Sequence, residues 1–190
     1  AMTGTINPDG SVGPVGGIPH KIDGAAKAGV KTLLVPIGQR SDYDENERRS
    51  VDLVQRGESQ GVKVQLVANV FEAFRSADGF ALLDLDEAQQ LRDLGWRGPI
   101  LLLEGAFEPR DLEACSRLNI WHVVHTEAQI DWLAAHKTQQ PHRVFLKMNS
   151  GMNRLGFTPT AFRSAWTRLN ALPQVDEISL MTHFSDADGD

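Results

Sequence analysis

The chain has 190 residues, 41% of them hydrophobic, and a formal net charge of −6 at pH 7. This length suits one folded domain or a slightly larger assembly with a core of its own, and the acidic balance argues against an extended phosphate-binding face. No apolar run is long enough to cross a membrane, and no signal segment opens the chain. The single cysteine, Cys115, cannot form an internal disulfide. We therefore expect a cytoplasmic protein without a nucleic-acid or membrane partner.

The first part of the chain, to about Val70, is rich in glycine and predicts short α/β elements. In chain order we expect strands at Thr5–Ile6 and Ser11–Val15 around the turn Asn7–Gly10, a helix from Ile18 to about Ala28, a strand at Val30–Pro36, a surface loop at Gln39–Glu47, a helix at Glu47–Gln60 and a strand at Val62–Val67.

Lys21 lies in the first turn of the helix that Gly16 and Gly17 begin. Helix N-termini carry partial positive charge, so a lysine is electrostatically unfavourable there. Two interpretations stay open: a general base in a catalytic site, or the more usual solvated surface charge.

After Val70 the sequence alternates between strands and helices. The predicted strands are Phe80–Leu85, Pro99–Leu103, Ile120–Val124, Val144–Met148 and Ile178–Phe184, and the helices between them are Asp86–Leu94, Pro109–Leu118, Glu127–Lys137 and Pro159–Leu172. Such repeated right-handed crossovers produce a parallel sheet. It is either an open, doubly wound sheet or part of a barrel, and polar residues at successive strand ends favour the barrel.

The stretch Arg143–Phe157 joins an apolar strand directly to a glycine-rich loop. The loop places Arg154 just past the C-terminal end of the strand, and Lys147 lies within the strand seven residues earlier. Ligands of parallel α/β proteins bind at this edge, because the loops converge there. A structural salt-bridge role for Arg154 stays an equal alternative.

Three histidines, His122, His125 and His183, lie on or next to predicted strands and raise the possibility of a metal site. No acidic residue accompanies them at a spacing typical of metal ligands. We expect buried, hydrogen-bonded or surface histidines, and no metal.

Residues 2–70 resemble the C-terminal half of the proteolytic domain of Lon-type serine peptidases, through the element GGIPHK followed by AAKAG. The resemblance implies that Lys21 corresponds to the lysine of a Ser–Lys pair. It also implies that the serine belongs to a segment preceding residue 1, since Ser11 does not match the family's nucleophile motif.

Residues 71–190 resemble alanine racemase, through the segments GFALLDLDEAQQLRDLGWRGPILLLEGAFEPRDLE, VFLKMNSGMNRLGF and LMTHFSDAD. The family uses pyridoxal phosphate and has a TIM-type barrel with a separate β domain. The resemblance implies that Arg154 binds the phenolic oxygen of the cofactor and the substrate carboxylate, that Met152 contacts that carboxylate through its backbone, and that His183 packs on the pyridine ring. Lys147 matches a lysine that is often carbamylated and then orients the arginine, whereas Asn149 replaces a common aspartate.

Two catalytic residues of that family have no match in this sequence. The lysine that bonds the cofactor lies in a V-K-A-N-A-Y-G motif, in whose place the Lon-like part stands, and the catalytic tyrosine belongs to the β domain; Tyr43 is the only tyrosine. We expect a racemase-derived fragment or chimera that retains part of the pyridoxal phosphate pocket and has little or no turnover. The alternatives are an inert chimeric scaffold and a Lon-like Ser/Lys peptidase module without its nucleophile segment, so enzymatic activity stays open.

The expected organisation is a Lon-like segment at 1–70 and a partial TIM-type α/β barrel at 71–190. Strands of the first segment are expected to complete the barrel or to pair along its open edge, because an uncovered edge favours aggregation. The remaining exposed edges favour a homodimer. The expected ligand, by resemblance, is a small amino acid.

Overall fold

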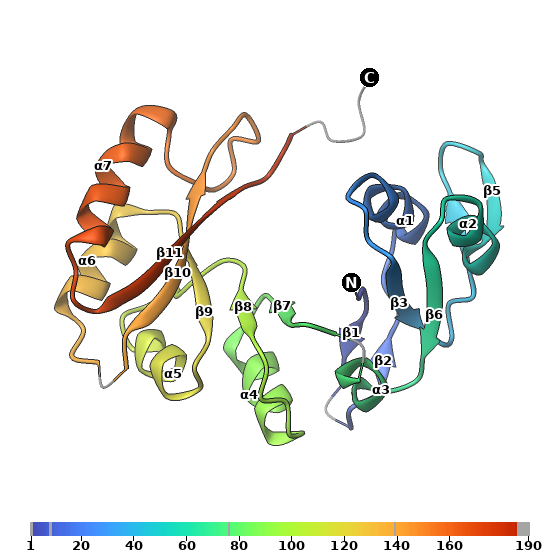
Figure 1. Ribbon diagram of the computed structural model, residues 1–190, viewed down its shortest axis with the longest axis horizontal. Coiled ribbons are helices and arrows are strands. Elements are labelled where there is room, and N and C mark those ends of the chain that lie inside the picture. Colours follow the sequence, from blue (N-terminus) through green and yellow to red (C-terminus); the bar gives the residue numbers. More distant parts are fainter. Residues whose placement is uncertain (1, 8, 76, 139, 186–190) are drawn as a thin grey trace. The chain divides into compact units, whose positions relative to one another are not determined.

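A computed structural model describes residues 2–7, 9–75, 77–138 and 140–185 (Figure 1). The chain divides into two units, residues 1–78 and 79–190. Each unit has its own cluster of buried hydrophobic residues. No helix in the described part of the chain is long and apolar enough to span a membrane.

In the residues that the structure describes, the first unit contains three small two-stranded sheets and three helices. Its elements are β1 (Thr5–Ile6), β2 (Val12–Gly13), α1 (Ile18–Lys27), β3 (Thr32–Pro36), β4 (Ser41–Asp44), β5 (Arg49–Asp52), α2 (Leu53–Ser59), β6 (Lys63–Val67) and α3 (Val70–Phe74). The predicted hairpin is present as the antiparallel pair β1–β2. Pro8 of its predicted turn lies outside the described residues.

The predicted surface loop at Gln39–Glu47 is wrong, since β4 lies within it and forms a second antiparallel hairpin with β5. Helix α2 consequently begins at Leu53 rather than at Glu47. The side chain of Asp52 fixes this start, because it accepts hydrogen bonds from the backbone N–H groups of Val54 and Gln55. Residues 47–52 therefore belong to a β-turn and strand, which their polar composition did not indicate.

The parallel strands β3 and β6 form the centre of the first unit's core. Ile18 and Ile22, one turn apart on α1, are fully buried with Val35 and Leu53. In the described residues β3 and β6 pair with each other as a separate sheet. Their apolar side chains are buried together with residues of α1 and α2, and the expectation that they complete the barrel or pair along its open edge stays a prediction.

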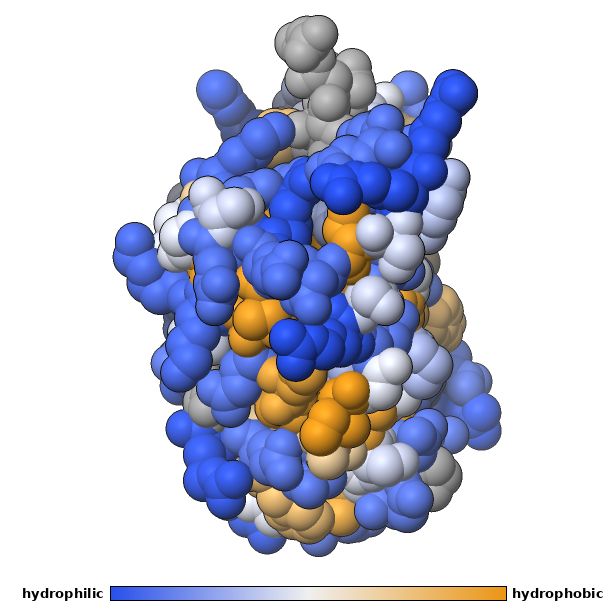
Figure 2. Space-filling model, turned by 90° about the vertical axis from the view of Figure 1, so that its right-hand side faces the viewer, coloured by the Kyte–Doolittle hydropathy of each residue, from blue (hydrophilic) through white to orange (hydrophobic). Residues whose placement is uncertain are grey.

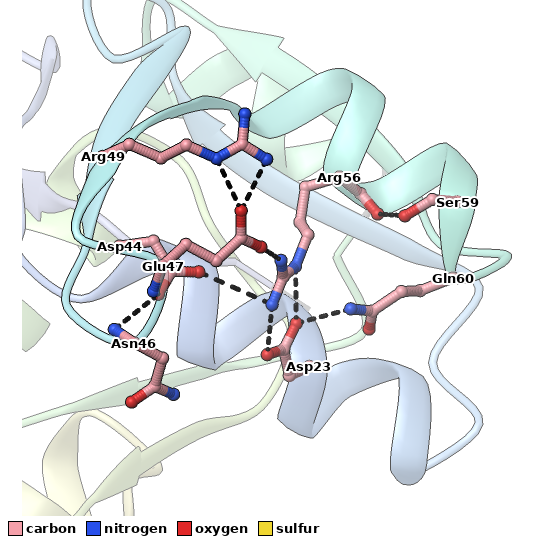
Figure 3. Close-up of polar contacts among 8 residues, drawn as sticks. All are labelled: Asp23, Asp44, Asn46, Glu47, Arg49, Arg56, Ser59 and Gln60. Carbon is pink, nitrogen blue, oxygen red and sulfur yellow. Dashed lines mark hydrogen bonds and ion pairs between the residues drawn. The ribbon is translucent and has the colours of Figure 1, made fainter.

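An ion-pair cluster around Arg56 joins the helices and the β4–β5 hairpin of this unit (Figure 3). The guanidinium of Arg56 donates two hydrogen bonds to Asp23 of α1, at 3.0 and 2.8 Å, and contacts Glu47 of the hairpin. It also lies 3.5 Å from the carboxylate of Asp44, whose side chain is only 1% exposed. One arginine therefore neutralises carboxylates from separate elements.

The second unit is a five-stranded parallel sheet in the order β11-β10-β9-β8-β7, with helices between the strands. Its elements are β7 (Phe80–Leu82), α4 (Leu85–Asp93), β8 (Ile100–Leu102), α5 (Asp111–Arg117), β9 (Trp121–Val124), α6 (Glu127–Ala135), β10 (His142–Met148), α7 (Pro159–Asn170) and β11 (Val175–Thr182). The strands adjoin in chain order, as in the wall of a barrel. This confirms the predicted α/β class and the parallel strand–helix alternation.

The helices cover one face of this sheet. Val144 and Leu146 of β10 are buried in one cluster with Ile130 and Leu133 of α6 and Leu169 of α7. Because side chains alternate along a strand, Lys147 points to the opposite face from Val144 and Leu146. That face and the C-terminal ends of the strands carry the candidate site.

Candidate functional site

Lys147 lies near the C-terminal end of β10 and is 7% exposed. Burial lowers the pKa of its ammonium group, and the nearby positive charge of Arg154 lowers it further, while Glu104 at the end of the β8 segment opposes the shift. The structure thus brings together the lysine and the arginine that the sequence singled out. Two like charges here constitute an electrostatically unfavourable pair unless an anion separates them.

The loop from Asn149 to Phe157 returns to the strand from which it leaves. The N–H of Phe157 donates to the carbonyl of Lys147 at 2.9 Å, and the N–H of Asn149 donates to the carbonyl of Phe157 at 2.8 Å. Gly156 has φ 117°, and a Cβ there would lie 2.7 Å from the Asn149 nitrogen. This closed base holds the exposed Arg154 beside the end of β10.

Asn149 organises the interior of the same loop. Its side-chain oxygen accepts from the N–H groups of Gly151 at 3.1 Å and Asn153 at 3.0 Å, and its amide nitrogen donates to the Asn153 side chain at 3.0 Å. The sequence left the role of this position undefined, although an Asn side chain that bonds the backbone two residues on is a common turn feature. Asn149 is therefore a positioning residue for the loop that carries Met152 and Arg154.

His183 is exposed and follows the end of β11. The hydroxyl of Thr182 donates to the carbonyl of Met148 at 2.9 Å, and lies 2.6 Å from the hydroxyl of Ser150, so the ends of β10 and β11 are held together. His183 thus lies at the same sheet edge as Arg154. Within the described residues, no hydrogen bond or ion pair joins the side chain of His183 to Arg154 or Lys147; residues 186–188 of its motif lie outside that part.

The histidines considered for a metal lie in two places. His125 belongs to the candidate edge: its Nε2 is 2.9 Å from the carbonyl of Glu104, and burial, followed by the charge of Lys147, lowers its pKa. His122 is 1% exposed, and its Nε2 lies 3.2 Å from Nδ1 of His142. The described residues contain no group of three or more His, Cys, Asp or Glu that could hold a metal.

Lys21 belongs to the first unit and lies in the first turn of α1. Its Nζ donates to the hydroxyl of Thr3 at 3.0 Å. The hydroxyl of Ser11 instead donates to the carboxylate of Asp9 at 2.7 Å. Among the described residues, no hydrogen bond joins Lys21 to Ser11.

Two family models match the chain. The model described as "Alanine racemase, N-terminal domain" matches residues 58–190, and the model described as "Lon protease (S16) C-terminal proteolytic domain" matches residues 1–73. Alanine racemase of Methylibium petroleiphilum is 86% identical over 123 residues, which are 65% of this chain and 34% of that protein. Alanine racemase of Acidovorax sp. (strain JS42) is 80% identical over the same share of both. The chain thus spans about a third of the length of these curated relatives.

Solved structures give the same result for the fold. The biosynthetic alanine racemase of Pseudomonas aeruginosa matches with a TM-score of 0.59 at 29% identity, over 90% of this chain and 43% of that one. The alanine racemase of Acinetobacter baumannii matches with a TM-score of 0.57 at 32% identity, over 63% of this chain and 34% of that one. Because the first family model covers well over half of the chain, the chain belongs to the alanine racemase family.

Proposed function

We propose that the second unit provides the anion-binding part of an alanine racemase site. In this proposal Arg154 holds the phenolic oxygen of pyridoxal phosphate and the carboxylate of alanine, and Lys147 orients Arg154. The observation that carries the proposal is the buried Lys147 at the end of β10, to whose carbonyl the loop that carries Arg154 returns through the Phe157 N–H. Two like charges at this edge favour binding of an anion or chemical neutralisation of the lysine.

The residues present fit the cofactor that the family uses. The guanidinium of Arg154 is planar and presents paired N–H donors, which suits an anionic oxygen. A lowered pKa increases the fraction of Lys147 present as neutral amine, which can add carbon dioxide to form a carbamate and release one proton. The carbamate is negative, so repulsion between positions 147 and 154 becomes attraction, and Lys147 then fixes the direction of the guanidinium. The pyridoxal phosphate, when bound, supplies an electron sink for negative charge on the amino acid's α-carbon.

The remaining site residues have supporting roles in the proposal. The exposed His183 packs against the pyridine ring, and the backbone of Met152 contacts the substrate carboxylate. Proton exchange at the α-carbon is not assigned to any residue of the second unit, because the family resemblance matches none of them to the cofactor-bonding lysine or to the catalytic tyrosine. The proposal therefore includes little or no turnover by these 190 residues alone.

An absorbance titration of the full chain with pyridoxal phosphate tests the proposal. We expect a saturable spectral change that weakens at least tenfold in affinity in Arg154→Ala and less strongly in His183→Ala. Arg163→Ala is the matched control, because Arg163 is an exposed arginine on α7 that belongs to none of the motifs of the candidate site. Loss of saturation in the control as well, or equal binding by Arg154→Ala and the unmodified chain, would refute the assignment and leave an inert scaffold.

A second candidate function is a Lon-like Ser/Lys peptidase module in the first unit. The match of residues 1–73 and the hydrogen bond that holds Lys21 beside Thr3 support it. Labelling with a fluorophosphonate probe tests it: labelling that Lys21→Met abolishes would support a serine activated by this lysine, and no labelling would reject the module as an active peptidase.

The proposed partner is a second copy of the chain. Strand β11 is at the edge of the five-stranded sheet, and Leu180 on it is 64% exposed, with Phe184 beyond it 69% exposed. Such apolar groups at a strand edge favour association. Light scattering should show a dimer that Leu180→Lys dissociates; a concentrated monomer of the unmodified chain would exclude it.

A further inference from the structure

A cavity of about 530 Å³ lies at the opposite end of the sheet from the candidate site. It is lined by Arg92, Asp93, Arg97, Arg117, Leu118, Asn119 and Gln140, and we name it the basic pocket. Arg97, Asn119 and Gln140 lie in the connections that lead into β8, β9 and β10, at the N-terminal ends of those strands. The basic pocket therefore shares no residue with the edge that carries Lys147 and Arg154.

Within the described residues, the three arginines of the basic pocket lack the carboxylate partners that some other arginines of the chain have. Arg40 and Arg56, for example, form ion pairs with aspartates. Across residues 2–7, 9–75, 77–138 and 140–185, no carboxylate oxygen forms an ion pair within 4 Å with any of the three. Asp93 also borders the cavity, but its carboxylate accepts from the amide of Gln89 at 2.8 Å. Three positive charges thus face one negative charge, in a chain whose net charge is −6.

Arg92 holds the pocket together through backbone contacts. Its guanidinium donates to the carbonyl oxygens of Leu118 at 2.9 Å, Gly98 at 2.8 Å and Asn119 at 3.0 Å, and to that of Trp96. Burial lowers the pKa of Arg92, and the like charge of Arg97 lowers it further. These contacts hold the guanidinium of Arg92 in a fixed position. The nearby positive charge of Arg97 repels it, and a bound anion would reduce this repulsion.

Arg97 and Arg117 have guanidinium N–H groups that form no hydrogen bond within the described residues. Arg97 uses one terminal nitrogen for the carbonyls of Arg92 and Trp96, and Arg117 uses one for the side chain of Gln89 at 3.3 Å. The other N–H groups of both guanidiniums have no partner among the described residues. Two such forks suit two phosphate groups, since guanidinium binds phosphate with paired hydrogen bonds.

Another cavity lined by arginines has a different balance of charges. It has a volume of about 440 Å³ in the first unit and includes Arg49 and Arg56, both paired with Glu47 (Figure 3). Its charge is balanced within the chain, so it calls for no ligand. Figure 2 shows one face of the molecule, which is largely hydrophilic with hydrophobic residues gathered in patches.

We propose that the basic pocket binds a small anion with two linked phosphate groups, either inorganic pyrophosphate or the diphosphate of a nucleotide. Arg92 supplies fixed positive charge, and Arg97 and Arg117 each hold one phosphate. The pocket presents no exposed aromatic ring among its lining residues, so the base of a nucleotide adds little to binding.

Calorimetric titration of the full chain at constant ionic strength tests this proposal. Sodium pyrophosphate should bind saturably and at least tenfold more tightly than orthophosphate, and its affinity should fall as sodium chloride is added. Arg97→Gln and Arg117→Gln should each weaken binding at least tenfold, whereas Arg163→Gln and Arg154→Ala should bind as the unmodified chain does. Arg92 is left intact because it joins four backbone carbonyls.

Each outcome decides the proposal. ADP binding as tightly as pyrophosphate, with AMP weaker, supports recognition of the diphosphate from either source. Equal binding of AMP and ADP, equal binding of orthophosphate and pyrophosphate, salt-independent binding, or full affinity in both Arg97→Gln and Arg117→Gln overturns it. Unchanged binding in Arg154→Ala separates this site from the proposed racemase site, so either can fail without the other.

Discussion

The buried histidines of the second unit should make its stability fall steeply in mild acid. His122 on β9 and His142 on β10 are 1% and 2% exposed, and their facing nitrogens are 3.2 Å apart. Burial and the charge of His142 lower the pKa of His122 from 6.5 to about 3. Burial and the charge of His136, whose ring lies 5.3 Å away, lower the pKa of His142 to about 4. The exposed Glu113 is the acidic group nearest to His136, at 3.9 Å.

The direction and magnitude of this loss of stability follow from the difference in proton binding between the folded and unfolded chain. Both histidines stay neutral in the folded chain at pH 5 but bind protons in the unfolded chain, so acid stabilises only the unfolded state. Above pH 6.5 these histidines leave the free energy of unfolding unchanged. As the pH falls from 6.5 toward 4 and 3, they lower it. At pH 5 each histidine lowers the free energy of unfolding by about 2 kcal/mol relative to pH 8, and the two together lower it by about 4 kcal/mol. That is a large part of the stability of an ordinary domain.

Urea unfolding at pH 8 and pH 5, followed by tryptophan fluorescence, measures this loss. All four tryptophans lie after residue 79, so the signal reports the second unit. The comparison is with the double variant His122→Met and His142→Met, which replaces the imidazoles by flexible apolar side chains. The unmodified chain should lose about 4 kcal/mol more than the variant between the two pH values. A loss equal to the variant's would refute the reasoning.

Three further predictions concern single residues. Arg56→Met should destabilise the first unit by about 3 kcal/mol, because it leaves the buried Asp44 without its countercharge. Thermal unfolding followed by circular dichroism measures this. A loss of stability as small as that of the variant Lys31→Met, at an exposed lysine, would contradict it. Cys115, whose pKa burial raises to about 12, should not react with a thiol reagent at pH 8 until the chain is unfolded in urea. Gly105→Ala should lower stability by about 2 kcal/mol or more in the same urea assay, because φ is 73° and a Cβ would lie 2.0 Å from a neighbouring carbonyl oxygen; unchanged stability would show that the loop adapts.

Local signals in the sequence determined most of the second unit. Thr126 and Gln129 form a capping box at the start of α6, and Thr158 caps the start of α7 before Pro159, close to where both helices were predicted. The order of apolar strands and helices also predicted the parallel sheet. These features depend on residues within a few positions of one another, which is why the sequence alone contains them.

The sequence alone predicted only part of the candidate site. The motif around Arg154 predicted an arginine past a strand end, because a turn next to an apolar strand is a local pattern. The nearness of Lys147 to Arg154 and Glu104 depends on strand register and loop closure, and Asn149's hydrogen bonds depend on the fold of its loop. The polar composition of Gln39–Glu47 likewise hid the β4 strand, since pairing with β5 decides its conformation.

Only the tertiary structure decided which distant residues share an environment. His122 and His142 are buried together because their strands are neighbours, and Arg97 and Arg117 border one cavity because successive helix-to-strand connections meet at one end of the sheet. No spacing along the chain encodes these meetings. The sequence by itself determined the family, the succession of elements and the candidate arginine, whereas long-range packing set burial, pKa and the charge balance of each cavity.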